Sequence, residues 1–233
     1  MDITITSIIE RYIEESKADD FHRYLSWDNC QKAFADDKET DFKALNLAYY
    51  LASWGMYRGS GGLLQKNHKI HEGPVKIFHS GKYDDLKCSA AMTVDESSID
   101  RILTLRNEIS SHYSTISFKR GNDPLKPISA TDTLMSKIML GIFGCVPAFD
   151  EFLINGMKEL GLKKRKFDEA GLKEIFKFYR ANEEEITLCI KLVENETGVY
   201  YPVMKIIDMY LWTIGYNKYL EELELKKQKS QVK

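Results

Sequence analysis

A lysine and an aspartate stand out in the segment TDTLMSKIMLGIFGCVPAFD, which covers residues 131–150 and is otherwise almost wholly apolar. Lys137 lies inside a helical pattern, and Asp150 follows 13 residues later, after a turn at Gly144 to Pro147. Two helices that meet at this turn would bring both side chains into one cleft. An amine in a partly dry pocket can act as a nucleophile, and a nearby carboxylate can stabilise a positively charged sugar. Lys137 and Asp150 are therefore the candidate catalytic pair.

Small residues surround Lys137 on the expected helix. Thr133, Gly141 and Gly144 lie at positions −4, +4 and +7 from it. A glycine inside a helix costs roughly 1 kcal/mol relative to alanine, which suggests that another helix or a ligand approaches the backbone here. In a second interpretation, Lys137 and Thr133 form the water-facing stripe of a half-buried helix. The residues alone leave both interpretations open.

The order of Ser136-Lys137, an apolar helix and Val146-Pro147-Ala148-Phe149-Asp150 resembles the active-site half of the helix-hairpin-helix DNA glycosylases, with the 8-oxoguanine branch as the nearest analogue. In that family a lysine attacks the sugar carbon of an extruded nucleotide, and an aspartate assists. The resemblance implies that Lys137 is the Schiff-base nucleophile and Asp150 the assisting acid. It covers about 20 of the 233 residues, and residues 128–133 lack the hairpin glycines of the family. The motifs SWGMYRG and TLMSKIMLGIFGCVPAFD also resemble those of an uncharacterised family of bacterial helical proteins, which implies no activity.

An enzyme that extrudes a base usually stacks it on aromatic side chains. In SWGMYRG, Trp54 and Tyr57 are the candidates for base stacking, and Arg58 is a candidate for nucleic-acid binding. The run Lys163-Lys164-Arg165-Lys166 is the best candidate for phosphate binding. The same residues also fit plainer roles, with the aromatic rings in the core and the cations in solvated loops.

A second constellation lies in LRNEISSHY, residues 105–113. Arg106 and His112 resemble the R-x(4–6)-H motif of the HEPN ribonucleases, which are also all-α. That resemblance implies that Arg106 stabilises the phosphate and His112 acts as acid or base. Residues six apart are about 600° apart around a helix, so the two side chains share a face only where the helix bends or ends.

A third interpretation is a non-enzymatic helical protein that binds a partner through the SWGMYRGSGG loop. A metal or other cofactor is not expected, because His68, His71 and His79 have no acid or cysteine at ligand spacing and Gly73-Pro74 interrupts their helix. Asp208 can pair with Lys205 or cap a neighbouring helix, and the sequence does not decide between a structural and a functional role.

Composition limits the class of protein. With 43% apolar residues in 233, the chain can bury a large core, and a net charge of −2 argues against coating nucleic acid by bulk charge. The four cysteines form no CxxC pair, which favours free thiols in a reducing cytosol. No secretory signal and no apolar run of about 18 residues is present, so we expect a cytoplasmic protein with no membrane partner. Nothing in the sequence indicates the substrate, the choice of DNA or RNA, or the oligomeric state.

Helical periodicity in most segments predicts an all-α fold, a compact bundle of roughly ten helices. The segment KRGNDPLKP, residues 119–127, contains one glycine and two prolines and is the expected boundary between two helical subdomains. We therefore predict an N-terminal subdomain over 1–118, a C-terminal subdomain over 128–225 and a fraying polar tail over 226–233.

Overall fold

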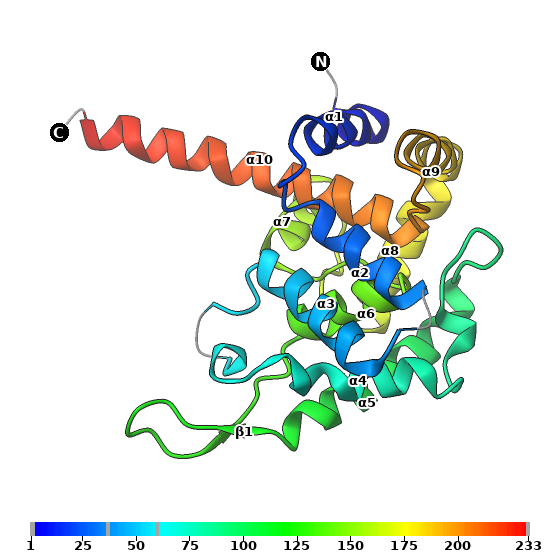
Figure 1. Cartoon of the computed structure of the whole chain (residues 1–233). Coiled ribbons are helices and arrows are strands. Elements are labelled where there is room, and N and C mark those ends of the chain that lie inside the picture. Colours follow the sequence, from blue (N-terminus) through cyan, green and yellow to red (C-terminus); the bar gives the residue numbers. More distant parts are fainter. Residues whose placement is uncertain (1–2, 36–37, 59–60, 232–233) are drawn as a thin grey trace.

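The computed structural model describes residues 3–35, 38–58 and 61–231, and the all-α prediction is confirmed (Figure 1). The described residues form ten α-helices and one antiparallel two-stranded sheet. The helices are α1 Ile5–Ala18, α2 Leu25–Ala35, α3 Thr40–Ser53, α4 Glu72–His79, α5 Ile99–Ser114, α6 Asp132–Ile142, α7 Glu151–Glu159, α8 Glu169–Ala181, α9 Glu183–Thr197 and α10 Val203–Gln231, and the strands are β1 Ser117–Phe118 and β2 Lys126–Pro127.

Side-chain caps determine where several helices begin. Thr131 caps α6, Asp150 caps α7 and Asp168 caps α8, and each side chain accepts a hydrogen bond from the backbone N–H three residues later. Such a cap satisfies an N–H group that the helix itself leaves unpaired and is worth about 1 kcal/mol. The candidate aspartate is thus fixed as the N-cap residue directly before its helix.

Two glycines let α7 and α10 cross in backbone contact. A Cβ atom on Gly156 would lie 1.9 Å from the carbonyl oxygen of Leu211, and one on Gly215 would lie 1.9 Å from that of Phe152. Any larger residue at either position would force the two helices apart. The close crossing holds the first half of α10 against the helix that Asp150 begins.

A single hydrophobic core runs through both predicted subdomains, with buried side chains from α1 to α3 beside others from α6 to α10. The expected boundary, residues 119–127, forms the loop and second strand of a hairpin arm that extends away from the body (Figure 1). Helix α10 continues to Gln231, so most of the segment expected to fray is helical, and its last turns leave the body of the molecule (Figure 1). None of the helices in the described ranges is both long and apolar enough to cross a bilayer.

Candidate active site at the start of helix α7

Three side chains on one face of α6 fix the chain that returns to form α7. The Thr133 hydroxyl donates a hydrogen bond to the carbonyl of Phe149 at 3.0 Å, and the N–H of Phe149 donates to the Ser136 hydroxyl at 2.8 Å. Lys137, one residue further, contacts Asp150. Residues three and four apart lie on one face of a helix. Thr133, Ser136 and Lys137 can therefore together hold two successive residues of the returning chain, Phe149 and Asp150.

Lys137 and Asp150 form a buried ion pair. Lys137 Nζ lies 2.8 Å from Asp150 Oδ2, and Lys137 is only 3% exposed. The other carboxylate oxygen accepts the N–H of Leu153 at 3.0 Å and so caps α7. The interpretation of Lys137 as part of a water-facing stripe is therefore wrong. One of the two glycines near Lys137, Gly141, makes room for the ring of Tyr50, because a Cβ there would lie 2.7 Å from the Tyr50 Cε1 atom.

A second buried amine and carboxylate lie on α10. Asp208 Oδ1 accepts the N–H of Ala148 at 2.8 Å, and Asp208 Oδ2 lies 4.0 Å from Lys205 Nζ. Asp208 thus faces Lys205, as in one of its two expected roles. It binds the loop before α7 rather than capping a helix, since Ala148 precedes the N-cap residue Asp150. Sequence reasoning missed the contact with Ala148, which joins residues 60 positions apart.

Four aromatic rings surround the Lys205 amine, and one of them also lies beside the Lys137 amine. Lys205 Nζ lies between 5.3 and 5.9 Å from the ring centroids of Tyr12, Trp27, Trp54 and Tyr201. Lys137 Nζ is 5.6 Å from the centroid of Trp54, the same distance that separates Trp54 from Lys205 Nζ. Trp54, a candidate for base stacking, therefore stands beside both amines. Such contacts stabilise a cation that has lost its water.

Burial controls the ionisation of the second pair. Removal from water lowers the pKa of Lys205, against the opposing effect of the Asp208 charge. The same loss of water raises the pKa of Asp208 to about 6, with Lys205 opposing the rise and Asp150 adding to it. Burial also raises the pKa of Asp28, which accepts the Tyr201 hydroxyl at 2.6 Å. The region is therefore a buried site with charges of both signs, in which the loss of water disfavours the ionised form of the carboxylates.

The basic run is linked to the candidate pair by one aromatic contact. Lys163, Lys164, Arg165 and Lys166 line a groove of about 510 Å³ together with Ile154 of α7. Phe167, directly after the run, stacks on Phe149, directly before Asp150, with ring centroids 5.0 Å apart. A phosphate bound to this run would therefore lie near the start of α7.

The other candidates in SWGMYRG have separate surroundings. The Tyr57 hydroxyl lies 2.8 Å from His71 Nε2, and His71 Nδ1 lies 2.5 Å from the Tyr113 hydroxyl. Burial lowers the pKa of His71 to about 3 and raises that of Tyr57 to about 12. Arg58 is exposed, and Gly59 and Ser60, the centre of the expected partner-binding loop, lie outside the described residues.

Arg106 and His112 contact different elements. Arg106 forms an ion pair with Asp132, the first residue of α6, and its guanidinium lies 5.5 Å from the ring centroid of Phe167. His112 Nε2 lies 2.8 Å from the carbonyl oxygen of Ile70, and its ring lies against Gly73. The structure thus brings Arg106 toward the region of Phe149 and Asp150, and it directs His112 toward the segment before α4. No observation favours the ribonuclease interpretation over the lysine site.

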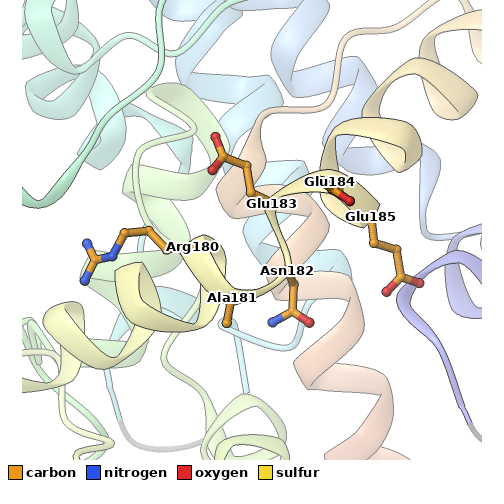
Figure 2. A pocket seen from close by; sticks show the side chains of 6 residues that line it. All are labelled: Arg180, Ala181, Asn182, Glu183, Glu184 and Glu185. Atoms are coloured by element: carbon orange, nitrogen blue, oxygen red, sulfur yellow. The ribbon is translucent and has the colours of Figure 1, made fainter.

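A concavity of about 460 Å³ lies at the junction of α8 and α9 and is lined by Arg180 to Glu185. Figure 2 shows these six residues. Their side chains point in different directions rather than toward a common centre (Figure 2), and Glu185 accepts hydrogen bonds from Thr6. Within the described ranges, no three His, Cys, Asp or Glu side chains are grouped to hold a metal ion. Cys30, Cys88, Cys145 and Cys189 are free thiols.

Comparison of the chain with protein-family models, curated proteins and solved structures finds no match. Its function therefore has to be inferred from the geometry around Lys137 and Asp150.

Proposed function

We propose that the chain acts on nucleic acid as a glycosylase-type enzyme, in which Lys137 is the nucleophile and Asp150 assists. The observation that supports this most is the buried contact of 2.8 Å between Lys137 Nζ and Asp150 Oδ2. A buried ion pair adds little to stability compared with apolar residues of the same volume, so its presence in a core favours a chemical role. The amine and the acid are close enough for direct proton transfer.

The reaction begins with the transfer of one proton from the Lys137 ammonium group to Asp150, which frees the lone pair of the amine. The amine attacks C1′ of a nucleotide, the bond from C1′ to the base breaks, and its electron pair leaves with the base. The departing base takes the proton from Asp150, which returns to the carboxylate. A proton then moves from the new C1′-bound nitrogen to the ring oxygen, the sugar ring opens, and a protonated imine links Lys137 to C1′.

The basic run supplies the contact with the strand. The run ends at Lys166, one residue before Phe167, whose ring stacks on Phe149 next to Asp150. Contacts between cations and phosphates position a nucleic acid without reading its sequence. This placement would hold the sugar-phosphate backbone beside the two catalytic side chains.

Borohydride trapping tests the proposal, because hydride reduces an imine to a stable secondary amine. The full chain would be incubated with borohydride and oligonucleotides that carry uracil, hypoxanthine, an oxidised guanine or an abasic site. We expect a covalent adduct that peptide mapping places on Lys137. Lys137→Met should abolish the adduct, and Lys158→Met, which removes an exposed lysine of α7, should retain it. An adduct on another lysine, or none on any oligonucleotide, would contradict the proposal.

A further inference from the structure

A small recess is lined by Lys205, Asp208 and Trp54, and it has no part in the proposed lysine chemistry. Its walls are the rings of Tyr12, Tyr24, Trp54 and Trp212, and its free volume of about 10 Å³ is the room of a single water molecule. The rings of Tyr24 and Trp54 are nearly parallel, with an interplanar angle of 8° and centroids 6.0 Å apart. The recess therefore presents flat aromatic faces above two ionisable groups.

Three polar groups on residues that line the recess lack full hydrogen-bond partners. Lys205 is 1% exposed, and its amine donates no hydrogen bond to any residue in the described part of the chain, since the nearest carboxylate oxygen is 4.0 Å away. Trp54 Nε1 is a buried donor that has no acceptor among the described residues. Asp208 Oδ1 accepts the N–H of Ala148, and Asp208 Oδ2 faces Lys205 without a hydrogen bond to it. Buried polar groups are seldom left in this state unless a ligand or water completes them.

The chemistry of these groups defines a ligand. An amine and an indole N–H donate, a carboxylate oxygen accepts, and aromatic rings form the walls. A planar heterocycle with a carbonyl oxygen next to a ring N–H complements all of them, whereas adenine offers an amino group in place of the carbonyl. We propose that the recess binds an oxo-nucleobase, with its carbonyl oxygen toward Lys205 and Trp54 and its ring N–H toward Asp208.

The position of Trp54 connects this recess to the candidate catalytic pair. Its ring centroid is 5.6 Å from Lys137 Nζ and 5.6 Å from Lys205 Nζ, so the two amines are separated by no more than twice that distance. A base held against Trp54 would place its sugar toward Lys137. The identification of the base as part of the substrate rests on the proposed function, while the binding of a free base does not.

Arg23 occupies the place that the base would take. Its guanidinium lies 4.8 Å from the ring centroid of Trp54 and 5.3 Å from that of Trp212, and the residue is exposed. A planar guanidinium and a planar base stack on aromatic rings in the same manner. Since the closed recess has room for only one water molecule, Arg23 has to leave the rings before a base enters.

Binding of free bases to the full chain tests this inference, with hypoxanthine and adenine as matched probes and calorimetry and tryptophan fluorescence as readouts. We expect hypoxanthine to bind at least about tenfold more tightly than adenine, since each well-formed pair of hydrogen bonds gives discrimination of this order. Lys205→Met and Asp208→Asn should each remove that preference, and Arg23→Ala should tighten the binding of both bases. Arg23 is at the surface, so that variant keeps the test valid if the buried variants do not fold.

Equal binding of the two bases, or no binding of either base to both the wild type and Arg23→Ala, would overturn the inference. Lys137→Met separates it from the proposed function, because this variant should lose the borohydride adduct and keep the preference for hypoxanthine. Preference for hypoxanthine in a protein that forms no adduct would support the recess and contradict the lysine mechanism. An adduct without such a preference would support the lysine mechanism and contradict the recess.

Discussion

At the scale of the residue, the buried contact between Lys137 and Asp150 makes the stability of the fold sensitive to the loss of either side chain. Each charge is away from water and depends on the other, with side chains 4% and 13% exposed. Removing one member of such a pair leaves an uncompensated buried charge, which costs about 3–5 kcal/mol. Asp150 has the additional task of capping α7 through Leu153.

Substitutions at Asp150 separate these two roles. Asp150→Asn loses the charge and keeps a side-chain oxygen for the cap, whereas Asp150→Ala loses both. We expect Asp150→Ala to have a free energy of unfolding about 1 kcal/mol lower than that of Asp150→Asn, because an N-cap is worth about this much. Urea denaturation of the two variants measures the difference, and equal stabilities would show that the cap contributes nothing.

Asp208 should make the stability of the protein depend on pH. Burial raises its folded-state pKa to about 6 from an ordinary value of 3.8. Between these values the folded protein holds a proton that the unfolded chain releases, so the free energy of unfolding falls as the pH rises from about 4 to about 6. A difference of about two pH units corresponds to about 3 kcal/mol.

The neutral variant Asp208→Asn is expected to lose this dependence. Urea denaturation at pH 4, 5, 6 and 7 would therefore show the wild type falling relative to the variant by about 3 kcal/mol across the series. Asp28 titrates in both proteins, so its contribution cancels in the comparison. Parallel curves would mean that Asp208 has an ordinary pKa in the folded state.

Sequence could predict the first pair and only part of the second. Lys137 and Asp150 are 13 residues apart, on consecutive helices joined by one turn, so local spacing brings them together. Lys205 and Asp208 are neighbours on one helix, and their pairing was among the expected roles. The recess could not be predicted, because Tyr12, Tyr24 and Trp54 reach Lys205 from the other end of the chain through tertiary packing.

At the scale of the element, the crossing of α7 and α10 depends on glycine. We expect Gly156→Ala to lower the free energy of unfolding by about 3 kcal/mol or more, because its Cβ would lie 1.9 Å from a backbone oxygen that cannot move alone. Gly61→Ala is the matched control, since the nearest atom to its Cβ is 3.9 Å away. Thermal or urea unfolding compares the two, and similar stabilities would show that α10 can shift at little cost.

The sequence indicates that a segment is helical more readily than it indicates which helices are in contact. Periodicity marks α1, α5 and α8 because one face of each is apolar, and the turn residues mark their ends. The same apolar pattern does not indicate which helix covers which face. Gly156 and Gly215 fit a plain helical interior in sequence, and only the crossing shows why both positions need glycine.

At the scale of the whole molecule, a net charge of −2 leaves local patches to decide what the surface attracts. The run of residues 163–166 and the hairpin of residues 117–127 both carry exposed cations. Replacing Lys163, Lys164 and Lys166 with serine should weaken binding to an oligonucleotide and reduce its salt dependence, because fewer counterions are released.

The matched control is the triple serine variant of Lys119, Arg120 and Lys126 in the hairpin, which removes the same charge elsewhere. We expect its affinity and salt dependence to stay close to those of the wild type, as measured by fluorescence anisotropy at several salt concentrations. Equal losses in the two triple variants would indicate attraction by overall charge rather than by the groove that residues 163–166 line.

The tight crossing of α7 and α10 gives the recess one stiff wall. Another part of its wall is Tyr24, which belongs to the short connection between α1 and α2 together with Arg23. Amide protons of the crossing should therefore exchange with deuterium only when the whole protein unfolds, whereas those of residues 19–24 should exchange through local opening. A molecule that enters the recess would then pass through this connection, and its arrival would slow exchange there while leaving the crossing unchanged.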